Sequence, residues 1–120
     1  MDDKVNLAAK LALLDAPFQP GIIGRLNDYK LALVKAQGEF VWHTHDDTDD
    51  FFLVLAGRLT IQLRDRDDVV LGPGELFVVP RGVEHCPKAD LETHVLLIEP
   101  AGTVNTGDAG GDLTAPERTI

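Results

Sequence analysis

The feature that most constrains this chain is the regular placement of glycine, proline and polar turns between short apolar runs, from Gly21 to Pro100. Short runs rich in Val, Ile, Leu and Phe that end at such turns are typical of β-strands. Clear turns occur at Asn27-Asp28, at Gly72-Pro73-Gly74 and at Pro80-Arg81-Gly82. Many short strands with frequent turns favour a sandwich or a barrel. The sequence therefore predicts an all-β fold.

The predicted strands are the apolar runs between these turns. They cover residues 22–26, 29–36, 40–45, 51–56, 59–64, 69–71, 75–79, 83–86 and 93–99. A chain of 120 residues with 44% hydrophobic content suits one domain with an ordinary core. We expect a single domain that consists of an N-terminal helical arm at 1–20, a barrel at 21–100 and a C-terminal extended tail at 101–120.

The two ends of the chain differ in pattern from the barrel. Residues 3–14 carry apolar side chains near helical spacing, at Val5, Leu7, Ala8, Leu11 and Leu14. This pattern predicts a short amphipathic helix that ends before Pro17, with an apolar face that covers either its own barrel or a neighbouring subunit. The residues after Pro100 are rich in glycine and lack periodicity, which predicts an extended arm.

Charge and cysteine content exclude several classes of function. The net charge of −9 and the pI near 4.7 argue against a nucleic-acid partner, because binding to phosphates needs a basic surface. The single cysteine, Cys86, excludes an intrachain disulfide and fits a reducing compartment. Residues 1–6 lack a signal-peptide pattern, and no apolar run is long enough to cross a membrane. We expect a cytoplasmic protein with no membrane partner.

The richest stretch for chemistry is the segment from Gly38 to Gly57, which contains His43 and His45. On a strand, alternate side chains share a face, so both imidazoles point the same way while Trp42 points the other way. Two imidazoles on one face can reach a single ion. The segment therefore predicts half of a metal site.

An acidic loop follows the two histidines, and its last residue is the best candidate for a carboxylate ligand. Asp46 and Asp47 fit a solvated turn. Asp50 begins the apolar run 51–56, so its carboxylate can face the same cavity as the histidines if this strand folds back against them. Asp49 is the competing candidate, because a slip of one residue exchanges the two faces of a strand.

A third histidine, His85, follows the predicted strand 75–79 and the turn Pro80-Arg81-Gly82. We predict that it completes the ligand set. His94 has no paired spacing and is expected at the surface or lining the cavity. Cys86 points away from its neighbour His85 by alternation, so we do not expect it to be a ligand. Arg81 is a surface charge placed where it can meet an anionic substrate at the mouth of the barrel.

These two segments resemble the paired motifs of the cupin superfamily, small barrels built on a jelly-roll plan. The positions that match the motifs are Gly38, His43, His45, Asp50 and Gly57 in the first and Gly74, Pro80, Gly82 and His85 in the second. Two positions depart from the usual pattern: Asp50 replaces a glutamate, and Ala89 stands where an asparagine is common. The shorter side chain of Asp50 leaves open whether it binds the metal directly or through water.

The resemblance implies a cupin double-stranded β-helix with a metal at His43, His45, Asp50 and His85. The flanking sequence is similar to that of compact single-domain cupins called mannose-6-phosphate isomerase-like, also known as the cupin type 2 conserved barrel. That label describes the fold and the metal cage, since the superfamily includes isomerases, dioxygenases, decarboxylases, sugar-binding modules and storage proteins.

Three imidazoles and one carboxylate suit a divalent ion such as Fe, Mn, Ni, Zn or Cu. We expect a metal-dependent enzyme that acts on a small oxygenated metabolite, with isomerisation or dioxygenation as the leading reactions. The alternative is a noncatalytic cupin that binds a small ligand as a sensor or carrier. We also expect a homodimer, because an open jelly roll has strand edges to cover and the N-terminal arm offers cover.

Overall fold

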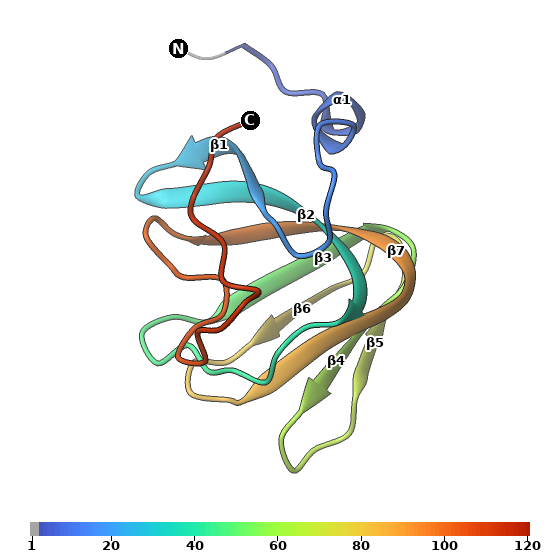
Figure 1. The fold of residues 1–120 in the computed structure, drawn as a ribbon, viewed down its shortest axis with the longest axis vertical. Coiled ribbons are helices and arrows are strands. Elements are labelled where there is room, and N and C mark those ends of the chain that lie inside the picture. Colours follow the sequence, from blue (N-terminus) through green and yellow to red (C-terminus); the bar gives the residue numbers. More distant parts are fainter. Residues whose placement is uncertain (1–2) are drawn as a thin grey trace.

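The computed structural model describes residues 3–120 and shows one antiparallel β-barrel with a single short helix (Figure 1). The elements in chain order are α1 (Leu7–Leu11), β1 (Gly21–Leu26), β2 (Tyr29–Glu39), β3 (Asp50–Ala56), β4 (Leu59–Leu63), β5 (Val69–Leu71), β6 (Leu76–Val79) and β7 (His85–Pro100). The predicted all-β fold with a short N-terminal helix is confirmed. Within residues 3–120, no helix has the length and apolar character needed to cross a bilayer.

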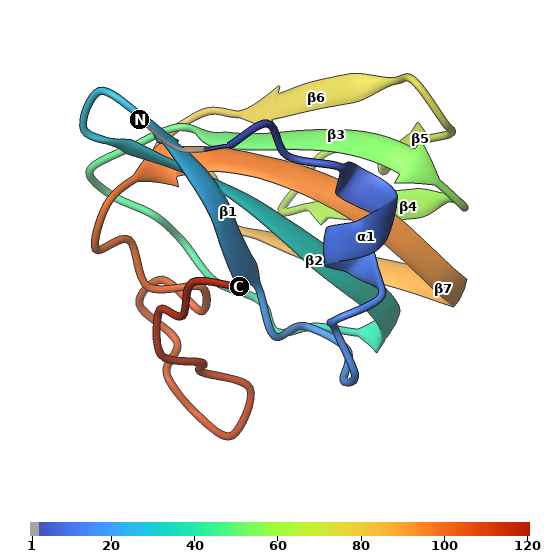
Figure 2. The same ribbon diagram turned by 90° about the horizontal axis from the view of Figure 1, so that it is seen from above.

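The long strand β7 holds the barrel together. Its second half pairs with β2 and β3, and its first half pairs with β4, so the strand order β1-β2-β7-β3-β6 continues into a second layer made by β4 and β5. Figure 1 and Figure 2 show β7 curving from one layer into the other. This curvature brings the two ends of β7, at His85 and Glu99, to the same barrel interior.

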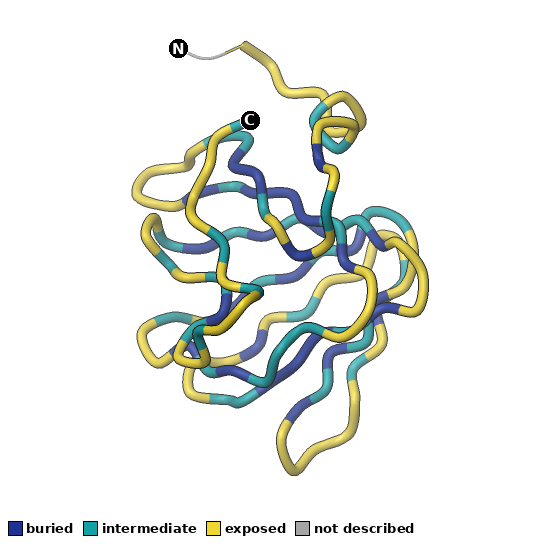
Figure 3. The backbone as a smooth tube through the Cα atoms, viewed as in Figure 1, coloured by how far each residue is buried: buried dark blue, intermediate teal, exposed yellow. Residues whose placement is uncertain are grey.

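The core lies between the two layers and follows the period of two that a strand imposes. In β4 the side chains of Leu59, Ile61 and Leu63 are buried while those between them are partly exposed. Strand β3 alternates in the same way, with Phe52 and Val54 inside. Figure 3 shows the buried residues concentrated in the strands and the exposed residues in the connecting loops.

Three predicted strands differ from the structure. Residues 40–45 form no strand and make only one bridge, between His43 and His85. The Phe40 N–H also donates to the Pro87 carbonyl of β7. The remaining contacts are with loops: the His45 carbonyl accepts from the Gly82 N–H, and the Thr44 N–H donates to Asp108. The last two residues of the predicted strand 83–86 and all of 93–99 belong to the single strand β7, because Lys88 and Ala89 stay paired with the end of β2.

Helix α1 is shorter than the predicted 3–14. The Asn6 side chain caps it by accepting a hydrogen bond from the Ala9 N–H at 2.9 Å, which leaves residues 3–5 outside the helix. Its C-terminal end tightens into turns that lead to the buried Leu14. None of the five helical residues is buried, and α1 lies on the outside of the barrel beside β2 (Figure 2).

The C-terminal segment 101–120 is not the extended arm that the sequence predicted. It folds in successive turns and returns to β1, where Ile22 pairs with Thr119. Thr106 is completely buried, and the Asn105 side chain bonds to the backbone of Leu113 and Ala115. Hydrogen bonds within the segment, rather than a periodic apolar face, hold it in this conformation. The composition of the segment therefore did not indicate that it packs against the barrel.

Candidate metal centre

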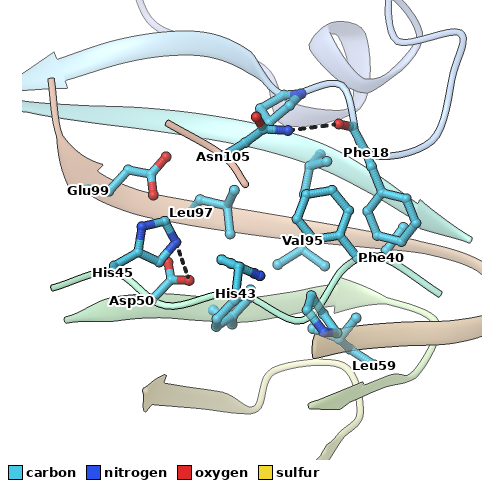
Figure 4. A pocket seen from close by; sticks show the side chains of 15 residues that line it. Phe18, Phe40, His43, His45, Asp50, Leu59, Val95, Leu97, Glu99 and Asn105 are labelled. Carbon is cyan, nitrogen blue, oxygen red and sulfur yellow. Dashed lines mark hydrogen bonds and ion pairs between the residues drawn. The ribbon is translucent and has the colours of Figure 1, made fainter. Parts of the chain in front are cut away.

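The structure brings together the four side chains that the sequence singled out as ligands. One potential ligand atom each from His43, His45, Asp50 and His85 lies within 4.8 Å of the others, and all four residues are buried. The first two come from the irregular segment before β3, Asp50 begins β3, and His85 begins β7. Figure 4 shows the side chains of His43, His45 and Asp50 at the wall of a cavity.

Backbone hydrogen bonds fix the spacing of the histidines. The His43 N–H donates to the His85 carbonyl at 2.9 Å, and the His85 N–H donates to the His43 carbonyl at 3.0 Å. The imidazole ring centroids of this pair are 4.3 Å apart, and the His45 ring lies 4.9 Å from that of His43. The prediction that His43 and His45 reach one point holds, although a bridge and loop contacts position them rather than a regular strand.

Two of the imidazoles have a defined tautomer. The Nδ1 atom of His43 lies 2.8 Å from the Val41 carbonyl oxygen, and that of His85 lies 2.8 Å from the Val83 carbonyl oxygen. A carbonyl can only accept, so each Nδ1 carries the proton and donates it. The Nε2 atom of each ring is then the one available to the cluster, which is the usual arrangement for metal-binding histidines.

Burial favours the neutral form of two of these rings. Loss of solvation lowers the pKa of His43 to about 4. Burial also lowers the pKa of His45, against the opposing attraction of the Asp50 carboxylate. A neutral imidazole is the form that binds metal, so His43 and His45 are ready ligands at neutral pH.

The distances around Asp50 are those of groups that can share one cation. Asp50 Oδ2 lies 3.0 Å from His85 Nε2 and 3.4 Å from His45 Nε2. Because Nδ1 of His85 faces the Val83 carbonyl, Nε2 is the nitrogen left to meet the carboxylate. A buried contact between these two atoms is satisfied by a shared proton or by a metal ion bound to both. Nitrogen and oxygen atoms bound to one ion at about 2 Å are separated by similar distances, so the residues fit a metal.

The structure also decides between the two candidate aspartates. Asp50 pairs with Val79 of β6 and turns its carboxylate inward. Asp49 lies outside, where its carboxylate accepts from the Arg81 N–H at 2.9 Å and approaches the exposed Arg81 guanidinium. Asp50 rather than Asp49 therefore faces the histidines, as predicted, although β3 pairs with β6 and β7 instead of forming the predicted hairpin with residues 40–45, and Arg81 lies next to Asp49.

The remaining candidates lie outside the cluster. Cys86 is fully buried, its Sγ lies nearest the Pro87 carbonyl, and burial raises the pKa of its thiol to about 11. His94 pairs with Glu92 near the surface at 2.9 Å. Both placements agree with the sequence-based prediction that neither residue is a ligand.

A cavity of about 50 Å³ adjoins the cluster, enough for a few waters or a small ligand. Its walls are mainly apolar, with Phe40, Phe52 and Leu97 among them. Three of its polar residues, His45, Asp50 and Glu99, lie together on one side (Figure 4). Other lining residues that the sequence analysis did not single out are Phe18, Pro20, Val34, Ala36, Leu59, Pro87, Val95, Glu99 and Asn105. Glu99 continues the inward alternation of Val95 and Leu97 on β7, and that period was a signal available in the sequence.

Comparisons with known proteins agree with this fold and site. Residues 30–99 match the family model described as the cupin domain. A cupin-2 domain protein from Shewanella frigidimarina is 45% identical, with a TM-score of 0.77 over 80% of this chain and 93% of that chain. The uncharacterized protein YdbB of Bacillus subtilis is 34% identical over 64% of this chain and 68% of its own.

A third comparison concerns the fold alone. Hydroquinone 1,2-dioxygenase from Sphingomonas sp. TTNP3, in a structure with 4-nitrophenol, is 19% identical with a TM-score of 0.76, over 83% of this chain and 33% of that chain. The family model covers more than half of the 120 residues and includes all four residues of the cluster. This chain belongs to the cupin domain family.

Proposed function

We propose that this protein binds a divalent transition metal through His43, His45, Asp50 and His85 and holds a small oxygenated ligand in the adjoining cavity. The observation that carries the proposal is the convergence of four buried side chains, whose potential ligand atoms all lie within 4.8 Å of one another. The three imidazoles and one carboxylate suit Fe, Mn, Ni, Zn or Cu. The reach of Asp50 supports direct ligation despite its short side chain.

A bound ion of this kind supplies a Lewis acid with open positions for ligand oxygens. The chain provides the rest of the site. Val41 and Val83 orient two imidazoles through their carbonyl oxygens, and Phe40, Phe52 and Leu97 form apolar walls of the cavity. A small cavity with convergent polar groups at one end is typical of sites for small molecules.

We favour a metal-dependent enzyme over a noncatalytic binding protein. The support is the additional buried carboxylate of Glu99 in the same cavity, since a site that only retains a ligand does not need a second acid–base group. Isomerisation and dioxygenation are the leading reactions. The alternative is a sensor or carrier, for which saturable ligand binding without turnover would be the decisive result.

Metal analysis of protein purified without added metal tests the proposal. We expect close to one equivalent of metal in the parent and almost none in His43→Ala and His85→Ala. His94→Ala is a matched control, because it removes an imidazole outside the cluster. Unchanged metal content in both cluster variants would show that the site is wrongly assigned.

A substrate screen under air and under nitrogen then separates the reactions. Turnover that requires oxygen identifies a dioxygenase, and turnover that is equal under both gases identifies an isomerase. The screen uses the metal-loaded protein, with His85→Ala as the inactive control.

The homodimer and the cytoplasmic location are further proposals. Exposed apolar side chains at Val5, Leu7 and Leu13 around α1, and at Leu76 and Val78 on β6, support a subunit contact. Sedimentation at micromolar concentration tests the dimer, and a single monomeric species would remove it.

A further inference from the structure

A second pocket lies beside the cavity that adjoins the cluster. It is formed by the linker between α1 and β1 (residues 12–20) and by the C-terminal segment, and its volume is about 170 Å³. The cavity at the cluster, here called the metal cavity, measures about 50 Å³. The apolar walls of the second pocket are Pro17, Phe18, Pro20, Leu113, Ala115 and Pro116. Its remaining lining residues are polar and exposed, so we call it the outer pocket.

The metal cavity and the outer pocket share a wall. Phe18 and Pro20 line both of them. Phe18 is only 8% exposed, although its neighbours Pro17 and Gln19 in the linker are exposed. Its ring packs against that of Phe40, with the ring centroids 4.8 Å apart. The Phe18 ring therefore separates the metal cavity from the outer pocket.

Phe18 has an unusual backbone conformation for a bulky residue, with a φ of +59°. Its N–H donates to the Lys35 carbonyl at 2.8 Å, and its carbonyl accepts from the Asn105 side chain at 3.5 Å. Strained residues of this kind persist where their surroundings hold them, and they are frequent at sites that clamp ligands. Both hydrogen bonds use the backbone of Phe18, so its ring is free to change rotamer while the linker stays in place.

The polarity of the two hollows changes along one direction. His45, Asp50 and Glu99 lie on one side of the metal cavity, and the rings of Phe18 and Phe40 lie on the other side (Figure 4). Beyond Phe18 come the apolar walls of the outer pocket. A ligand whose oxygen atoms meet the cation site would thus direct its apolar part towards Phe18.

We propose that the metal cavity and the outer pocket form one elongated site, in which Phe18 sets the length of the ligand. The ligand class is a compound with an oxygen-donor group at one end and an unbranched apolar tail. Rotation of the Phe18 ring admits the tail to the outer pocket. This inference rests on the proposed metal function, because the cation fixes the oxygen-donor end of the ligand.

Straight-chain hydroxamates of increasing length test this proposal, because the head group binds zinc through two oxygen atoms and only the tail changes. Calorimetric titration of the zinc-loaded, full-length protein measures their affinity. Each methylene group that leaves water for an apolar pocket strengthens binding roughly four-fold. Displacement of the Phe18 ring offsets part of this gain. We therefore expect hexanohydroxamate to bind at least about 10-fold more tightly than acetohydroxamate.

Ala115→Phe fills the outer pocket without changing the metal cluster. The Ala115 N–H that donates to the Asn105 side chain belongs to the backbone and is retained. We expect this variant to bind acetohydroxamate like the parent and to lose the gain from the longer tail. Ala101→Phe is the matched control, because Ala101 is an exposed alanine of the same segment that lines neither hollow. It should match the parent with both compounds.

Phe18→Leu tests the separating ring itself. The smaller side chain removes most of the obstacle to the tail, so hexanohydroxamate should bind several-fold more tightly than it does to the parent. The affinity for acetohydroxamate and the zinc content should stay the same. Loss of the tail-dependent gain in Phe18→Leu would contradict the separating role of this ring.

Fluorine spectra of zinc-loaded protein labelled with 4-fluorophenylalanine follow the ring directly. The chain has five phenylalanines, and the resonance that is missing from Phe18→Leu belongs to Phe18. Hexanohydroxamate should shift this resonance, and acetohydroxamate should leave it in place. A stationary Phe18 resonance would overturn the role of Phe18.

The elongated site and the metal site fail separately. A zinc-loaded parent that binds both hydroxamates with equal affinity would overturn the elongated site alone. An equal gain from the longer tail in Ala115→Phe and in the parent would do the same, because the tail would then lie elsewhere. Failure of the parent to bind zinc would instead overturn the metal site.

Discussion

Asp50 and Glu99 are both buried carboxylates on neighbouring strands, yet their surroundings give them different chemistry. Asp50 meets imidazoles at 3.0 and 3.4 Å, and its oxygens can share a cation with them. Glu99 lies 3.4 Å from the ammonium group of Lys30. The same ammonium group lies closer to Glu117, at 2.9 Å. Burial is the same within the pair, so the partners supplied by adjoining segments decide which carboxylate is placed to bind a metal and which one is favoured to hold a proton.

The largest expected effect comes from removal of Lys30, the lysine that Glu99 shares with Glu117. Lys30→Met keeps the apolar stem but leaves Glu99 buried without its cation. We expect a loss of stability on the order of 3 kcal/mol at pH 8. The pKa of Glu99 is already raised, so the folded state accepts its proton as the pH falls through about 7, and the loss should be much smaller at pH 5.

Urea denaturation at both pH values measures this difference. Lys88→Met, on the partly exposed Lys88 of β7, is the control for loss of a lysine. An equal loss of stability at pH 5 and pH 8 would contradict the idea that Lys30 compensates the charge of Glu99.

The Asp50 side of the comparison can be sharpened with two substitutions. Asp50→Asn preserves size and removes the charge, and we expect about 10–100-fold weaker metal binding. The carboxylate already reaches His85, so Asp50→Glu should bring no gain in affinity. Competition with a chelator measures the metal affinity of both variants. Tighter binding in Asp50→Glu would mean that the native carboxylate stops short of the metal.

Acidification should release the metal at a lower pH than it would from a site made of exposed histidines. An imidazole of ordinary pKa 6.5 loses roughly 30-fold in its neutral fraction at pH 5. The pKa of His43 is lowered to about 4, so its ring stays neutral in the folded protein at pH 5. The unfolded chain takes up this proton first, so stability of the metal-free protein should fall as the pH drops from 6.5 towards 4.

Metal content after equilibration across this pH range tests the expectation. A release midpoint at 6.5 would contradict the protected state of His43.

The smallest expected effect comes from the contact between the C-terminal segment and the loop that carries His43 and His45. Gly107 has a φ of +53°, and a Cβ added there would lie 2.3 Å from the Thr44 carbonyl oxygen. Gly107→Ala should therefore cost about 1–2 kcal/mol and weaken metal binding only a few-fold, through displacement of His43. Gly110→Ala is the matched control, since Gly110 also has a positive φ but open space around it. Equal effects of the two substitutions would assign the cost to backbone strain alone.

The sequence predicts the fold and the metal cluster because both depend on local patterns. Turn residues divide the strands, and the position of Asp50 at the start of the apolar run 51–56 favours it over Asp49. The prediction of a strand at 40–45 was wrong because the partners of those residues are loops and the C-terminal segment, which no local pattern specifies.

The environment of Glu99 was harder to predict than the metal cluster. Its inward direction follows from the period of β7, but its charge partners come from separate places: Lys30 near the start of β2 and Glu117 near the end of the chain. Neither residue belongs to a spacing motif. The irregular C-terminal segment, which carries Glu117, gives no hydrophobic signal that would place it against β1.

The reciprocal backbone bonds between His43 and His85 have a consequence for how the loop opens. They join residues 40–49 to the start of β7, so an ion held by both rings would act as a reversible cross-link between the two segments. Metal at 100 times its dissociation constant would oppose any opening that breaks the site by about 2.7 kcal/mol. Amide hydrogen exchange at these residues would then slow about 100-fold on metal loading. A protease that cleaves only the open loop would cut the metal-loaded protein more slowly than the metal-free protein.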